Sequence, residues 1–267
     1  MKLVTLTFDD GLDNHLDTVM PLLEQHGFRG TFFVNPCNPT FTRRLDAWRM
    51  AAKRGHELGN HTLFHPSWRH KGYVTEGNDV ETYSVDRMRL ELEAVNHLLA
   101  GLDGEQHRTF AYPCCTTVVG RPGWTKRLLQ SLHLDRTRLM GALCRYPRLD
   151  FGSCERSYVP LASSLFSASR TGGEAFSASP GHYPPSKAEV PCIMLDGKNK
   201  LQLQTVLQAF ERVETGWLVF AAHGIGTGLR LNCDADVFEY LLAELKATSW
   251  SVVTFRDGAQ AILGTET

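Results

Sequence analysis

The sequence predicts an α/β fold in which a parallel sheet or barrel is flanked by helices. Two observations carry this prediction: strand-like apolar runs alternate with segments of helical periodicity, and polar residues with catalytic chemistry follow four of the strands. In parallel α/β folds the site lies at the carboxyl ends of the strands. The 267 residues are enough to bury a substantial core.

The elements of the first half follow from apolar patterning. Leu16, Val19, Leu22 and Leu23 recur at helical spacing, and Gly27 is a suitable helix stop. Met88, Leu92, Val95 and Leu99 form a second such stripe. The pattern thus predicts strands at 4–8, 30–34, 56–61 and 108–113, and helices near 16–26, 42–54 and 84–99.

The second half is less regular until its end. Residues 167–185 are rich in Gly, Pro and Ser and predict a long loop, within an irregular insertion around 145–198. Beyond it the pattern predicts a helix near 201–213, a strand at 216–224, a helix near 234–246, a strand at 250–255 and a last short helix. No repeat or linker divides the chain, so we expect one domain over 1–267.

Composition excludes several classes of partner. The formal charge is -1 and 42% of residues are hydrophobic, so we expect neither a nucleic-acid nor a membrane partner. The N-terminus lacks the long apolar segment and cleavage site of a secretion signal, which predicts a cytoplasmic protein. Seven cysteines without CxxC spacing predict reduced thiols. The oligomeric state cannot be inferred.

Candidate functional residues fall at the ends of separate strands. Asp9 and Asp10 follow VTLTF, His61 follows HELGN, the turn Tyr112–Pro113–Cys114 follows RTFA, and His223 follows WLVFAA. Taken singly, each has an ordinary explanation: Asp-Gly is a turn former, and an isolated histidine is more often a core residue. Their shared position at strand ends predicts one site.

These residues suit metal-assisted hydrolysis. His61 and His65 lie four residues apart, and with an upstream carboxylate they make three ligands that leave a position for water. One aspartate would bind the ion, while the other stays free to take a proton from water. His223 is the candidate acid for the leaving group. Two imidazoles and a carboxylate suit zinc, although cobalt, nickel, manganese or iron could bind there.

Four motifs resemble those of the polysaccharide deacetylases, carbohydrate esterase family 4, also called the NodB-homology domain. They are TFDDG (7–11), HTLFHP (61–66), FAYPC (110–114) and LVFAAHG (218–224). The resemblance implies a distorted (β/α) barrel of about seven strands and metal-dependent removal of acetyl groups from a sugar or oligosaccharide. It assigns Asp9 as base, Asp10, His61 and His65 as metal ligands, His223 as acid and the Cys114 amide as oxyanion donor. Tyr112 and Pro113 would contact substrate.

The third motif departs from the family pattern. Ala111 stands where the family usually has an arginine that orients the base, and Cys114 stands in place of a tyrosine. No clear fourth motif supplies the acid that would support His223, for which Asp150 and Asp196 are candidates. Two other functions therefore stay open: a related hydrolase acting on a non-sugar amide, and a catalytically impaired module that binds glycan or a partner without turnover.

Overall fold

The computed structural model describes residues 1–134, 137–146, 149–171 and 186–264. Its main sheet consists of parallel strands in the order β7-β4-β3-β2-β1-β9-β8, with β12 also pairing with β1. These strands are β1 (Lys2–Asp9), β2 (Thr31–Val34), β3 (Glu57–Asn60), β4 (Thr109–Ala111), β7 (Ala168–Arg170), β8 (Ile193–Met194), β9 (Gly216–Ala222) and β12 (Ser251–Val252).

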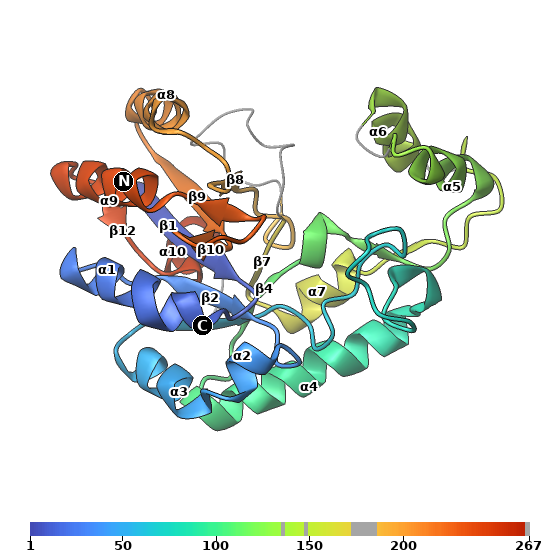
Figure 1. Cartoon of the computed structure of the whole chain (residues 1–267), viewed down its shortest axis with the longest axis horizontal. Helices are drawn as coiled ribbons and strands as arrows, with labels where there is room; N and C mark the ends of the chain where they lie inside the picture. The colour runs from blue at the N-terminus through green and yellow to red at the C-terminus, as the bar shows by residue number, and fades with distance from the viewer. Residues whose placement is uncertain (135–136, 147–148, 172–185, 265–267) are drawn as a thin grey trace.

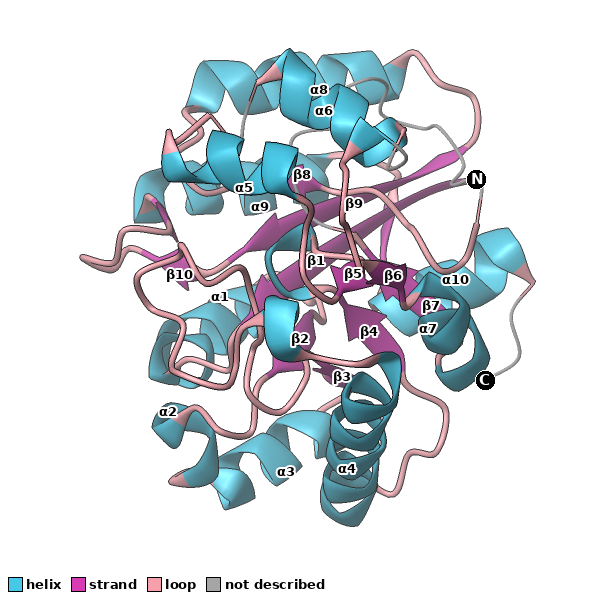
Figure 2. Ribbon diagram, turned by 90° about the vertical axis from the view of Figure 1, so that its right-hand side faces the viewer, coloured by secondary structure: helices cyan, strands magenta, loops and turns pink. Residues whose placement is uncertain are grey.

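Helices surround the sheet (Figure 2). The α-helices are α1 (Met20–Gln25), α2 (Pro39–Thr42), α3 (Leu45–Lys53), α4 (Val85–Asp103), α5 (Trp124–Ser131), α6 (Arg138–Arg145), α7 (Val159–Leu165), α8 (Lys200–Glu211), α9 (Ala235–Ala247) and α10 (Phe255–Leu263). Shorter turns of helix are η1 (His15–Val19), η2 (Val80–Thr82) and η3 (Pro113–Cys115). Two small strand pairs complete the fold: β5 (Val118–Val119) with β6 (Arg156–Ser157), and β10 (Gly224–Ile225) with β11 (Asn232–Cys233).

The sheet curls into the distorted barrel that the sequence resemblance implies. The segment before β8 joins its two edges, because the Val190 amide donates to the Ser169 carbonyl at 2.8 Å and the Thr171 amide donates to the Val190 carbonyl at 2.9 Å. A few residues later, Ile193 and Met194 pair with β9 at the opposite edge. One stretch of chain thus links β7 to β9.

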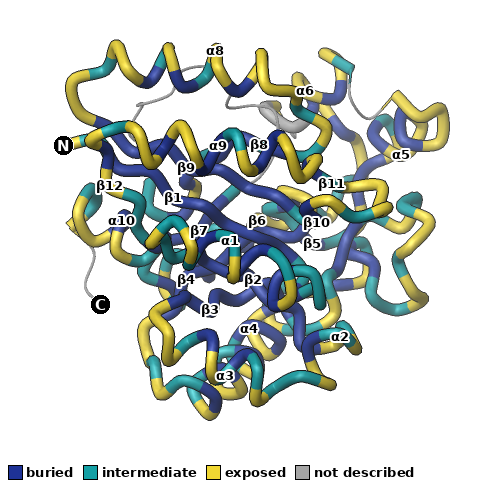
Figure 3. The backbone as a smooth tube through the Cα atoms, turned by 60° about the vertical axis from the view of Figure 1, so that its left-hand side comes forward, coloured by how far each residue is buried: buried dark blue, intermediate teal, exposed yellow. Residues whose placement is uncertain are grey.

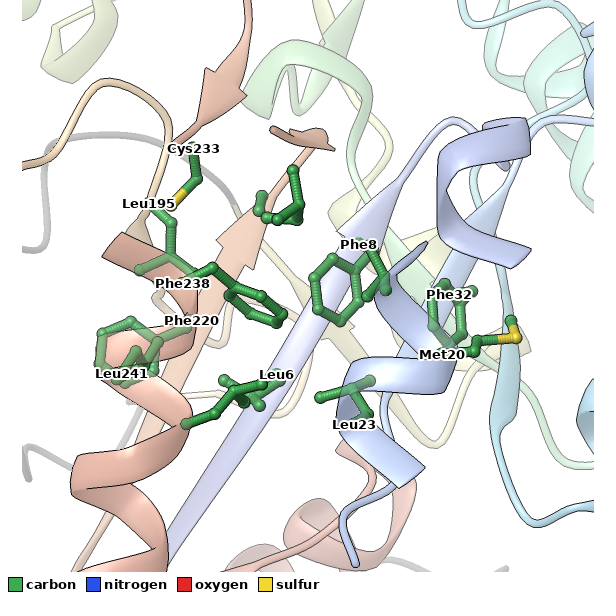
Figure 4. Close-up of a cluster of buried hydrophobic side chains, with 14 of the residues drawn as sticks. Leu6, Phe8, Met20, Leu23, Phe32, Leu195, Phe220, Cys233, Phe238 and Leu241 are labelled. Carbon is green, nitrogen blue, oxygen red and sulfur yellow. The ribbon is translucent and has the colours of Figure 1, made fainter. Parts of the chain in front are cut away.

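Hydrophobic residues on alternate positions of the strands contribute to the two largest apolar clusters, one on each face of the sheet. Outward-facing residues such as Leu6, Phe8 and Phe32 pack under the helices, where the rings of Phe8 and Phe32 stack at 5.1 Å (Figure 4). Inward-facing residues such as Leu3 and Phe33 pack against α10, which covers the amino-terminal part of the barrel interior. The strands are therefore buried on both faces, while the helices carry the exposed positions (Figure 3).

The predicted strands and helices of both ends of the chain are present, and the middle is more ordered than its composition indicates. Residues 145–198, expected to be an irregular insertion, contain α7, β7 and β8, and β7 is an integral strand of the sheet. The predicted loop 167–185 lies mainly outside the described residues, at 172–185. Helices α5 and α6 stand apart from the barrel (Figure 1) and share a small apolar cluster of their own.

Hydrogen bonds define where the longer helices begin and end. The Ser84 hydroxyl accepts from the Arg87 amide at the start of α4, and Gly104, with a φ of 78°, ends this helix in the left-handed conformation.

Among the described residues, no helix combines the length and the apolar character needed to cross a bilayer.

Candidate active site

The residues predicted from four strand ends lie together at one rim of the barrel. Asp9 is the last residue of β1, His61 directly follows β3, and His223 directly follows β9. Because these strands are parallel, their carboxyl ends open onto the same side. The sequence prediction of one shared site therefore agrees with the topology.

Asp10, His61 and His65 form a cluster with the dimensions of a metal site. One Asp10 oxygen, Oδ1, lies 3.7 Å from His61 Nε2 and 3.5 Å from His65 Nε2. The ligand atoms of the three residues all lie within 4.8 Å of one another, and no other group of this kind occurs in the described part of the chain. Their number and chemistry match the three protein ligands of catalytic zinc sites.

His61 is prepared as a neutral ligand. Its Nδ1 lies 2.8 Å from the Ala111 carbonyl, so this nitrogen carries the proton and Nε2 presents its lone pair to Asp10. Burial is the largest influence on its pKa and lowers it to about 4, although Asp9 and Asp10 act in the opposite direction. A deprotonated imidazole is the form that binds a cation. The donor set thus fits a divalent ion.

The backbone around the cluster is strained. Non-glycine residues in the left-handed region number six in the described chain, and five of them lie at this rim: Asp10, Thr62, His65, Cys114 and Cys115. Such conformations cost about 1–3 kcal/mol each and persist where the surrounding structure holds them. Their concentration at the predicted site supports a functional reason for the strain.

Asp9 has an environment different from that of its neighbour. Its Oδ2 accepts a hydrogen bond from Arg170 Nη2 at 2.5 Å, and its buried Oδ1 has no hydrogen-bond partner among the described residues. Burial alone would raise the pKa of this carboxyl, but Arg170, His61 and His223 outweigh it and lower the pKa to about 2. Asp9 is therefore an ionised carboxylate with one acceptor atom still unused.

His223 is held by a second carboxylate. Its Nδ1 lies 2.6 Å from Asp196 Oδ2, and its amide donates to Asp196 Oδ1 at 3.1 Å. Burial lowers the pKa of His223, but the bond to Asp196 and the charges of Asp9 and Asp10 overcome it and raise the pKa to about 9. At neutral pH this imidazole is protonated and able to donate from Nε2.

The buried side chain of His15 holds the backbone of His223 in place. His15 Nε2 lies 2.8 Å from the His223 carbonyl, and the Leu12 amide donates to His15 Nδ1 at 3.2 Å. Burial lowers the pKa of His15 to about 4, so it is neutral and its Nε2–H is the donor. His15 thus connects the turn after β1 to the end of β9.

Within the described residues, the structure leaves the Cys114 amide free for its predicted role as oxyanion donor, but it does not support the predicted substrate contacts of Tyr112 and Pro113. The amides of Cys115 and Thr116 bond within the turn, whereas the Cys114 amide has no acceptor in the described chain. The side chains of Tyr112 and Pro113 are buried, and Tyr112 packs against Phe110 and Tyr158. Neither side chain therefore offers an open surface for substrate, because both complete the core beneath the rim.

The exposed face of this turn lies beside Tyr73. The Tyr73 hydroxyl lies 2.7 Å from Cys114 Sγ, and its ring lies 6.2 Å from that of His65. The loop after β3 therefore reaches across to the end of β4, and the two segments form adjacent walls of the site.

Arg170 and Asp196 are the functional candidates that sequence reasoning missed or left open. Arg170 lies in a Ser-rich segment whose composition indicates a loop, so the sequence offers no signal for it. Of the two acids considered for His223, Asp196 is the one in contact, whereas Asp150 accepts from the Gly123 and Lys126 amides at the start of α5.

The fold and the rim define a class of protein: a parallel α/β barrel with a His-and-carboxylate cluster at the carboxyl ends of its strands. The sequence profile of the polysaccharide deacetylase family matches residues 1–132. Residues 1–132, just under half of the chain, therefore match that family, as their motifs indicated.

One relative matches part of the chain in sequence. The peptidoglycan-N-acetylmuramic acid deacetylase PdaA of Bacillus subtilis (strain 168) is 29% identical over 117 residues, which cover 42% of this chain and 38% of that protein. The chain thus spans less than two-fifths of the length of this relative.

Two solved structures share the fold. The Xyl-CE4 domain of a multidomain xylanase from the hindgut metagenome of Trinervitermes trinervoides superimposes with a TM-score of 0.55 at 15% identity, covering 99% of this chain and 92% of that one. The family 4 acetyl xylan esterase of Clostridium thermocellum, in complex with a cobalt ion, gives 0.52 at 16% identity and covers 99% and 93%.

Proposed function

We propose that this protein removes acetyl groups from a carbohydrate by hydrolysing an amide or an ester bond, with a divalent cation bound to Asp10, His61 and His65. The observation that carries the proposal is that a proton acceptor and a proton donor both lie beside the cluster. Asp9 is an ionised carboxylate that bonds to Arg170, and His223 is a protonated imidazole that bonds to Asp196. The relatives named as deacetylases and as an acetyl esterase support this reaction type.

The cation would supply Lewis-acid chemistry, since a bound divalent ion polarises a carbonyl and lowers the pKa of water toward neutrality. The neutral imidazole of His61 and the carboxylate of Asp10 are suited to hold it. Two imidazoles and one carboxylate favour zinc, which we take as the first candidate.

The protein groups have separate tasks in this reaction. Asp9, through its unused Oδ1, accepts a proton from the attacking water. The Cys114 amide donates to the carbonyl oxygen as negative charge develops on it. His223 gives its Nε2 proton to the departing nitrogen or oxygen as the bond to the acetyl carbon breaks. The products are acetate and the free amine or hydroxyl.

Arg170 and Asp196 are positioning residues in this scheme. Arg170 holds one oxygen of Asp9, so the other is directed to water, and Asp196 fixes the tautomer of His223. The arginine absent from the third motif therefore has a counterpart at the site, which favours an enzyme over a catalytically impaired module.

The experiment measures metal content and acetate release in parallel. We expect about one ion per chain in the wild type, loss of metal and of acetate release in Asp10→Ala and His61→Ala, and retained metal with about 100-fold slower release in Asp9→Asn. Matched controls are Asp86→Ala and His97→Ala, which change exposed residues on α4. Metal without acetate release would instead support a binding module, and release from non-sugar amides alone would support the amide hydrolase.

A further inference from the structure

A cavity lies outside the cluster of Asp10, His61 and His65. Its volume is about 740 Å³. It is lined by the loop between β3 and α4, by the paired strands β5 and β6 with the residues next to them, and by α5, with Arg69, Glu81, Arg121, Arg127 and Arg156 among its walls.

The cavity wall is strongly cationic. Four arginines line it against one carboxylate, Glu81. Arg69 pairs with Asp79 at 3.0 Å, but Arg121, Arg127 and Arg156 form no ion pair with any residue that the structure describes. Guanidinium groups gathered around one recess repel one another and raise the local positive potential. An anion bound among them would relieve this repulsion.

The backbone that carries these arginines is well anchored. The Gly120 amide donates to the Val80 carbonyl at 2.7 Å, and the Cys154 amide donates to the Arg121 carbonyl at 2.9 Å. Gly120 has a φ of 95°, and a Cβ on it would lie 2.5 Å from the Cys154 carbonyl oxygen, so only glycine permits this close approach. Arg121, between β5 and α5, and Arg156, the first residue of β6, therefore lie on backbone that is fixed by these bonds.

Two segments of chain connect the site with the walls of the cavity. Arg69 follows His65 by four residues, a separation of at most about 14 Å between their Cα atoms. Gly120 and Arg121 follow Cys114 by six and seven residues, and the Tyr73 hydroxyl lies 2.7 Å from Cys114 Sγ. A carbohydrate chain bound at the cluster could therefore extend into the arginine-lined cavity.

We propose that this cavity binds an anionic substituent, a carboxylate or a phosphate, on the same carbohydrate from which the acetyl group is removed. This proposal rests on the proposed function and narrows its substrate to acidic glycans. The planar guanidinium forks of arginine match both kinds of oxyanion and form paired hydrogen bonds with them. A neutral polysaccharide would leave Arg121, Arg127 and Arg156 without a charged partner, because none of the described residues forms an ion pair with them.

Direct binding tests the cavity without requiring turnover. Chitohexaose, a phosphorylated chitohexaose and a hyaluronan hexasaccharide are titrated by calorimetry into the metal-loaded full chain at low and high salt. We expect at least one anionic ligand to bind about tenfold or more tighter than chitohexaose, with the advantage reduced by salt. Preference for the hyaluronan fragment would identify a carboxylate site, and preference for the phosphorylated sugar a phosphate site.

Matched variants assign the effect to the cavity. Arg121→Gln/Arg156→Gln should lose the preference for the anionic ligand, whereas Arg89→Gln/Arg212→Gln removes the same charge at exposed positions elsewhere and should retain it. Equal binding of neutral and anionic ligands by the wild type, or equal loss in both double variants, would overturn the proposal.

Acetate release separates this inference from the proposed function. If the wild type deacetylates hyaluronan and chitin fragments, the cavity variant should raise KM for the anionic substrate specifically. If no substrate releases acetate but arginine-dependent anion binding persists, the proposed function fails while the anion site stands. If acetate is released and the arginines have no effect on binding or KM, the proposed function stands and the anion site is rejected.

Discussion

At the scale of single residues, the two adjacent aspartates have different environments because the backbone turns between them. Asp9 continues the inward-facing series of β1 that includes Thr7, and both residues bond to Arg170. Alternation along a strand would direct Asp10 to the opposite face. Instead, Asp10 has a φ of 78°, and its carboxylate lies beside His61 and His65 at the same rim.

Arg170→Met should weaken Asp9 as a base. Without the guanidinium, burial dominates and the pKa of Asp9 rises from about 2. The acidic limb of kcat/KM against pH should therefore move upward by about one to three pH units. The comparison is with Arg89→Met on the exposed face of α4, whose profile should match the wild type; an unshifted limb in Arg170→Met would contradict the positioning role.

The same ion pair affects folding stability in acid. The pKa of Asp9 lies below its ordinary value of 3.8, so its contribution is complete above that pH and is lost as the pH falls toward 2. Urea denaturation between pH 2 and 6 should therefore show a smaller acid-dependent loss of stability in Arg170→Met than in the wild type.

Asp196→Asn should lower the pKa of His223 from about 9. A proton donor is lost as the pH rises through its pKa, so the basic limb of the rate profile should move to lower pH by about one to three units. NMR titration of the His223 ring gives the same quantity without turnover. Asp150→Asn is the control, because Asp150 bonds to α5 and not to His223.

At the scale of elements, strand pairing explains how an arginine on β7, and not on β4, can bond to Asp9. Arg170 on β7 is the direct register partner of Ala111 on β4, the position where the family motif usually has its arginine. Paired residues of neighbouring parallel strands face the same side of the sheet. The small Ala111 side chain leaves this side open to the Arg170 guanidinium.

This register predicts that an arginine at position 111 of β4 can restore activity that is lost when Arg170 of β7 is removed. Arg170→Ala should reduce kcat by about 100-fold, and adding Ala111→Arg should recover at least about tenfold of that loss by placing a guanidinium near Asp9 again. The measurement is kcat together with the acidic limb of the pH profile. Recovery of stability without recovery of the limb would show that the new arginine fills space but does not reach Asp9.

At the scale of the whole molecule, the segment before β8 connects the barrel edges and supports the strand that carries Arg170. Val190 is buried, and its backbone bonds to Ser169 and Thr171 flank Arg170 on both sides. The geometry of Asp9 and Arg170 therefore depends on closure of the sheet as well as on β1 and β7 themselves.

Val190→Pro should open this closure, because proline has no amide proton for the Ser169 carbonyl. We expect the free energy of unfolding to fall by about 3 kcal/mol or more and the Thr171 amide to exchange faster with deuterium. Val190→Ala keeps the backbone bond while removing packing, so it should lose stability yet keep Thr171 protected. Equal exchange in the two variants would show that the bridge does not hold β7.

The sequence by itself determined the alternating elements and five of the residues at the rim: Asp9, Asp10, His61, His65 and His223. This was achievable because strand periodicity is local and because parallel strands place their carboxyl ends together. The motifs also indicated the family, which the profile match confirms.

Only the tertiary structure decided which groups set the protonation of Asp9 and His223. Arg170 lies 161 residues from Asp9 along the chain, in a segment of loop-like composition, and Asp196 was one of two acids that the sequence could not separate. Their roles depend on strand register and closure of the barrel, which bring distant residues within hydrogen-bonding distance. Burial, the cause of the largest single influence on each pKa at the rim, likewise arises only when the chain is folded.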